Sequence, residues 1–175
     1  MRRVFVAFSL IALTAMSGLS ANEATKSPSQ EQAESAKTAL LKLFGNLKKT
    51  PHNTPYAVTI DLATGAMSMD NTAVRWEFNL GDLNPDNIYS RTWHPLGLDQ
   101  MARTVGAECF GDQPCVTRGE SNGSGGYKKD PEKLKAVRFE VYRGEGTAFQ
   151  RDLDAEGVAA ETLATLIRYS RLQKH

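Results

Sequence analysis

The chain has 175 residues, with 21 Lys and Arg against 20 Asp and Glu. Charges of both signs are interspersed, so the sequence lacks the basic footprint of a nucleic-acid-binding domain, and we expect no nucleic-acid partner. The length suffices for one ordinary domain whose core needs no metal ion.

Residues 1–21 have the pattern of a secretory signal peptide. Two arginines precede an apolar run, and small residues follow it up to a cleavage site after Ser20 or Ala21. An uncleaved membrane anchor is the alternative, but the apolar run is shorter than the roughly 20 residues that a spanning helix needs. We therefore expect a periplasmic or secreted bacterial protein with no stable membrane insertion after cleavage.

An amphipathic helix is predicted in residues 28–50, after a disordered leader at residues 22–27. Ser27 is the expected cap, Pro28 lies in the first turn, and the helix extends to about Lys48. Its apolar stripe consists of Ala33, Ala36, Leu40, Leu43, Phe44 and Leu47.

Residues 55–175 are expected to form an α+β domain that begins with short strands joined by turns. Residues 74–80 alternate strictly between apolar and polar side chains, which is typical of a half-buried strand. The other expected strands are Tyr56–Asp61, Ala66–Met69, Asn87–Thr92, Ala102–Cys109, Cys115–Arg118 and Lys135–Arg143.

The C-terminal part of the chain contains a glycine-rich connection and then a second helix. We expect Ser121–Pro131 to be a mobile hairpin connection and the helix to begin near Asp152 or Asp154. Its predicted inner face consists of Ala155, Val158, Ala159, Leu163, Leu166, Ile167 and Ser170.

The only cysteines, Cys109 and Cys115, predict a disulfide that pins a hairpin in an oxidising compartment. Closing this short loop is worth about 2.4 kcal/mol in the entropic model. A redox-active or free thiol pair is the alternative. Two cysteines without a nearby histidine do not form a zinc site, and we expect no metal and no cofactor.

The layout resembles pleckstrin-homology-like (PH-like) domains over about Tyr56–Leu172. Three segments carry the likeness, and they are similar to small bacterial secreted proteins of uncharacterised function: residues 76–88, the Cys109–Cys115 pair and residues 163–172. The resemblance implies a strongly bent antiparallel sheet, or partial barrel, closed by a C-terminal helix. It carries no functional residue onto this chain.

Residues 119–123 match G-x-S-x-G, the nucleophile motif of α/β hydrolases. That motif needs a helix directly after the serine, whereas GSGGYKKDP follows Ser121 here. Asp152 and His175 complete the triad order only nominally. A flexible turn explains the pattern better, and we predict no catalytic residues.

A partner surface is the remaining functional expectation, formed by Arg91, Trp93, His94 and Tyr127. Trp93 has an alternative role as a plug for the open end of the sheet. The preferred hypothesis is an exported, non-enzymatic binding or accessory module. The alternatives are a secreted inhibitor or immunity-type protein acting on a hydrolase through the Cys109–Cys115 loop, and a serine hydrolase using Ser121.

Overall fold

The computed structural model describes residues 27–45, 56–93, 101–144 and 153–174. The predicted order of a helix, then strands, then a helix is confirmed, so the chain is α+β. The elements are α1 (Gln30–Gly45), β1 (Ala57–Ile60), β2 (Ala66–Asp70), β3 (Val74–Asn79), η2 (Leu80–Asp82), β4 (Leu83–Trp93), β5 (Met101–Cys109), η3 (Phe110–Asp112), β6 (Thr117–Ser121), β7 (Tyr127–Lys129), β8 (Ala136–Gly144) and α3 (Leu153–Gln173).

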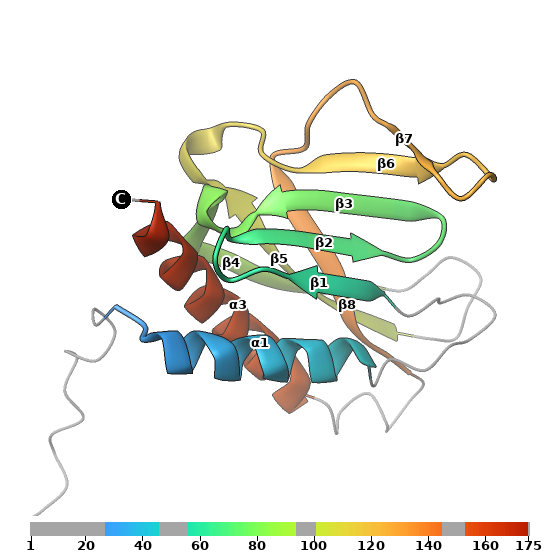
Figure 1. The fold of residues 1–175 in the computed structure, drawn as a ribbon. Coiled ribbons are helices and arrows are strands. Elements are labelled where there is room, and N and C mark those ends of the chain that lie inside the picture. Colours follow the sequence, from blue (N-terminus) through green and yellow to red (C-terminus); the bar gives the residue numbers. More distant parts are fainter. Residues whose placement is uncertain (1–26, 46–55, 94–100, 145–152, 175) are drawn as a thin grey trace, which may run out of the picture.

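The strands form two antiparallel sheets (Figure 1). One has five strands in the order β1-β2-β3-β6-β7, and the other has three in the order β4-β5-β8. The expected single, strongly bent sheet or partial barrel is not confirmed, since neither sheet is closed or strongly curled. The chain leaves the first sheet at η2, where Asn79 accepts a hydrogen bond from the Gly81 N–H at 2.9 Å.

Helix α1 begins two residues later than predicted. The Gln32 N–H donates to Ser29 Oγ at 3.2 Å, and the Ser29 N–H donates back to Gln32 Oε1 at 2.8 Å. This reciprocal pair is a capping box. The Ser27-to-Gln30 spacing is the same, but only the pair beginning at Ser29 directly precedes the helix.

A single core lies between the two sheets and the helices. Phe44 of α1 contacts Phe139 of β8 and Tyr56, with ring centroids 5.2 and 5.9 Å apart. These contacts fix α1 to the rest of the fold, and α1 also contacts α3 and β1. The largest fully buried side chains are Phe139, Leu40, Met69, Leu80, Leu83, Leu163, Leu166, Ile167, Val105, Val116 and Val137.

Helix α3 packs across β4, β5 and β8. Its predicted inner face is buried except near the start, where Val158 is 41% exposed. Glu156 pairs with Arg103 of β5. Gly65, with φ +72°, lets the helix approach the β1–β2 turn, because a side chain there would overlap buried Ser170.

The strand predictions are largely confirmed, with shifted bounds. β4 begins at Leu83 rather than Asn87, and β6 begins at Thr117 rather than Cys115. β7 lies inside the segment that was expected to be only a connection. It pairs with β6 because Asn122 closes the turn, accepting hydrogen bonds from the backbone N–H groups of Ser124 and Gly126 at 3.0 and 3.1 Å.

Cys109 and Cys115 form the predicted disulfide, with their Cα atoms 5.8 Å apart. The bond does not pin a hairpin, because β5 and β6 belong to different sheets. It closes the connection between the sheets. The backbone N–H groups of Cys109 and Cys115 donate hydrogen bonds to the backbone carbonyls of Lys135 and Leu134. None of the described helices is long and apolar enough to span a membrane.

Candidate functional site

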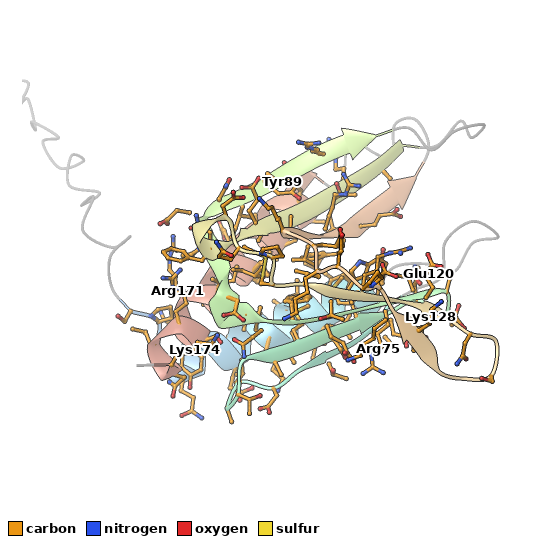
Figure 2. All side chains as sticks on the ribbon, turned by 90° about the horizontal axis from the view of Figure 1, so that it is seen from above. Arg75, Tyr89, Glu120, Lys128, Arg171 and Lys174 are labelled. Carbon is orange, nitrogen blue, oxygen red and sulfur yellow. A yellow bond between two sulfur atoms is a disulfide. The ribbon has the colours of Figure 1, made fainter. Side chains whose placement is uncertain are left out.

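The outer face of the five-stranded sheet is polar because its residues alternate with core residues. Trp76 and Phe78 of β3 join the core or pack against it, so Arg75 and Glu77 point outward. The register aligns Arg75 with Gly119 of β6, and Gly119 with Lys129 of β7. Figure 2 shows Arg75 on the side of this sheet that faces away from the three-stranded sheet.

A shallow hollow opens on this face, with a cavity volume of about 20 Å³. It exists because Gly119 has no side chain in the middle of a strand, where neighbouring side chains would otherwise meet. A glycine inside a strand often marks a bulge, a tight bend, or a site where a ligand or another backbone approaches closely. The hollow is lined by Arg75, Glu77, Thr117, Gly119, Tyr127 and Lys129.

Tyr127 is held in place on one side of this hollow. Its hydroxyl donates to Asp70 Oδ1 at 2.7 Å. The Arg75 guanidinium lies 6.0 Å from the centre of the tyrosine ring, at the outer limit of a cation–π contact. The hydrogen bond to Asp70 raises the pKa of Tyr127, because losing the proton would place two negative charges together.

Glu77 links the two cations of the hollow. Its carboxylate oxygens lie 3.0 Å from Arg75 Nε and 2.9 Å from Lys129 Nζ. The hydrogen bond from Lys129 holds the pKa of Glu77 below its usual value. The local charges therefore compensate one another, which suits recognition of polar groups better than attraction of a highly charged ligand.

The disulfide loop, residues 109–115, presents a second feature. Phe110 is 52% exposed, and the Arg171 guanidinium of α3 lies 3.8 Å from the centre of its ring. Leu134 and Leu172 are also exposed, at 38% and 47%. Leu134 hydrogen-bonds the loop through its carbonyl, and Leu172 follows Arg171 in the chain. Phe110 is thus the large exposed apolar side chain of this loop, and Leu134 contacts the loop through its backbone.

Arg91 and Tyr127 of the predicted partner surface lie in different sheets. Arg91 is in β4, where its guanidinium lies 5.5 Å from the centre of the Tyr89 ring. Figure 2 shows Tyr89 and Arg75 on opposite sides of the molecule, so Arg91 and Tyr127 do not share one face. The Trp93 side chain and His94 lie outside the described residues.

Ser121 is the last residue of β6 and is exposed. A turn and β7 follow it, rather than the helix that a hydrolase nucleophile requires. Asp152 and His175 lie outside the described residues. Among the described residues, no group of three or more His, Cys, Asp or Glu is placed to hold a metal ion.

Sequence reasoning missed the hollow and the exposed Phe110. The alternation of residues 74–80 already placed Arg75 and Glu77 opposite the core face. Nothing in the sequence showed that β3 pairs with β6, which brings Gly119 beside them. The sequence predicted which residues form strands but not the order in which the strands pair.

Comparison of the chain with protein-family models, with curated proteins and with solved structures finds no match. We therefore infer function from the geometry of the hollow beside Tyr127 and of the disulfide loop.

Proposed function

We propose that the chain is an exported, non-enzymatic binding or accessory module of the bacterial envelope. Its contact surface is the outer face of the five-stranded sheet around Tyr127. The signal-peptide pattern of residues 1–21 supports export, and the disulfide is compatible with an oxidising compartment.

One observation carries the choice of surface: a fixed aromatic side chain stands beside an open hollow. Asp70 anchors the Tyr127 hydroxyl and Arg75 flanks the ring, so little side-chain entropy is lost when a partner binds. Tyrosine and arginine are also the residue types most enriched among side chains that dominate binding energy. The outward edge of Arg75 and the hydroxyl of Thr117 supply hydrogen-bonding groups around the hollow.

The test is site-specific photocrosslinking in intact cells. Benzoylphenylalanine at position 117 lies in the hollow, and the same residue at position 158 on α3 is the matched exposed control. We expect a discrete crosslinked species from position 117 only, and we expect Arg75→Gln to remove it without lowering the unfolding midpoint. Identical crosslinking from both positions would contradict the proposal.

The finer PH-like arrangement remains part of the proposal. Packing of α3 across the three-stranded antiparallel sheet supports it, since a C-terminal helix covers a sheet in that fold.

A secreted inhibitor is the second candidate, favoured by Phe110. A disulfide-closed loop that exposes an aromatic ring is a rigid anchor for an apolar pocket of a hydrolase. Phe110→Glu should then abolish inhibition of envelope hydrolase activity, while Val158→Glu on α3 should not. Equal inhibition by both variants would exclude the loop as the inhibitory element.

A further inference from the structure

The turn between β6 and β7 concentrates hydrogen-bond donors on one side-chain carbonyl. Asn122 Oδ1 accepts from the Ser124 N–H at 3.0 Å, from Ser124 Oγ at 2.8 Å and from the Gly126 N–H at 3.1 Å. Three donors around one amide oxygen resemble the arrangement that stabilises the oxyanion of an acyl-transfer intermediate. The amide carbon of Asn122 is therefore polarised for nucleophilic attack.

The neighbouring nucleophile is the backbone nitrogen of Gly123. Because Asn122 Oδ1 binds the N–H two residues further on, the side chain is folded back along its own following peptide. Gly123 has φ +77° and no side chain, and nothing lies within 4 Å of the position that a Cβ atom would occupy there. Among the described residues, its N–H makes one long contact, 3.4 Å, to Ser121 Oγ.

We propose that Asn122 is a self-modification site, which converts through a succinimide to isoaspartate and aspartate. The Gly123 nitrogen loses its proton to solvent base and forms a bond to Asn122 Cγ. The Cγ–Nδ2 bond then breaks and ammonia leaves with a proton from solvent. Water opens the resulting ring at either carbonyl. Water is the only co-reactant, and no oxidation or reduction occurs.

Asn71 provides an internal control whose side-chain carbonyl also accepts backbone hydrogen bonds, from two donors instead of three. Its Oδ1 accepts from the Val74 and Ala73 N–H groups at 2.8 and 3.3 Å. The next residue, however, is Thr72, whose branched side chain hinders attack. The Thr72 N–H is also held by the Asp70 carboxylate at 2.7 Å. Hydrogen bonds thus polarise the side-chain carbonyl of both asparagines. Only Asn122 is followed by a residue whose backbone nitrogen is accessible for attack.

Formation of isoaspartate lengthens the backbone by one methylene at the end of β6. The Asn122 N–H then no longer matches the Gly126 carbonyl, which it now meets at 3.0 Å. Tyr127 follows Gly126 directly, so the modification loosens the strand that presents this ring. The effect on partner contact rests on the proposed function, but the modification itself does not.

The experiment is incubation of the mature protein at mildly alkaline pH, followed by peptide mapping that separates asparagine, aspartate and isoaspartate. We expect conversion at Asn122 and none at Asn71 over the same period. Ser124→Ala removes one donor to Oδ1 and should slow conversion about fivefold, the equivalent of one net hydrogen bond. Gly123→Ala should nearly abolish it.

Both substitutions lie in an exposed turn, so unfolding midpoints can verify that each variant is folded. Equal conversion at Asn122 and Asn71, or faster conversion in Ser124→Ala, would overturn the proposal. Because the readout is the peptide map, the result does not depend on whether the hollow beside Tyr127 binds a partner.

Discussion

The outer face of the three-stranded sheet has a glycine at its centre, beneath a tyrosine. Gly106 of β5 is paired with Tyr89 of β4, and Arg91 stacks on the tyrosine at 5.5 Å. A Cβ atom at Gly106 would lie 2.7 Å from the Tyr89 ring and 2.7 Å from the Val137 carbonyl. The ring therefore fills the space that the glycine leaves.

The five-stranded sheet repeats this combination with a different outcome. Gly119 lies next to Tyr127, and Arg75 flanks that ring at 6.0 Å. A Cβ atom at Gly119 would come no closer than 3.3 Å to the Lys128 carbonyl or to Tyr127 Cβ. Asp70 holds the tyrosine hydroxyl, and although Gly119 is itself buried, a hollow lined by Gly119, Tyr127 and Arg75 remains.

The comparison shows that the same three residue types can serve packing in one sheet and leave a surface open in the other. What differs is whether the tyrosine hydroxyl has an acid partner that holds the ring to one side. This distinction can be tested by filling each glycine position and by removing the contacts around it.

Gly106→Ala should have the largest effect. The new methyl group would meet backbone on one side and a stacked ring on the other, so the strands must shift. Overpacking of this kind costs about 3 kcal/mol at the upper end of its usual range. Urea unfolding monitored by circular dichroism measures the change, and an unchanged midpoint would show that Tyr89 moves away freely.

Removing the disulfide should have the next largest effect. Cys109→Ser/Cys115→Ser opens the connection between β5 and β6, and thus between the two sheets. The loss of the closed loop should lower the free energy of unfolding by about 2.4 kcal/mol in the entropic model. Reduction of the wild-type protein is the matched measurement. If the double variant is less stable than the reduced wild type, the packing of the two serine side chains contributes to the loss of stability.

Much of this fold follows from local sequence signals, and the predictable part stops where long-range pairing begins. Phe78 alternates with polar neighbours, so its strand and core face were predicted correctly. The disulfide pair was also predicted, but its place between two sheets was not, because turn residues do not specify which strands pair. The cap at Ser29 was missed because Ser27 offers the same spacing to glutamine.

The candidate site was less predictable than the fold. Tyr127 was expected at a partner surface, but only as part of a mobile connection, because a three-residue strand leaves too short a pattern to recognise. Gly119 was assigned to a flexible turn because it belongs to the G-x-S-x-G pattern. Its actual position, opposite Arg75 and Lys129, depends on strand order.

Gly119→Ala should have a much smaller effect on stability than Gly106→Ala. The methyl group meets its nearest atoms at 3.3 Å, which requires a shift of only a few tenths of an ångström. The entropy gained over glycine, roughly 0.5 kcal/mol, offsets part of that cost. The unfolding midpoint should therefore stay near that of the wild type, while crosslinking from position 117 decreases. A fall in stability as large as that of Gly106→Ala would remove the distinction between the two faces.

The smallest expected effect is a loss of folding stability at alkaline pH, caused by ionisation of Tyr127 in the five-stranded sheet. Its pKa is raised by the hydrogen bond to Asp70, whereas in the unfolded chain it returns to about 10. The bond therefore stabilises the fold below about pH 10, and this contribution is lost as the pH rises through the folded pKa.

Tyr127→Phe should thus be less stable than the wild type at neutral pH, and the difference should shrink above about pH 10. Urea midpoints measured across this range provide the test. Tyr89→Phe is the matched control, because the Tyr89 hydroxyl has no carboxylate partner among the described residues. A difference between wild type and Tyr127→Phe that stays constant with pH would mean that Asp70 does not hold the ring. The hollow beside Gly119 would then need another cause.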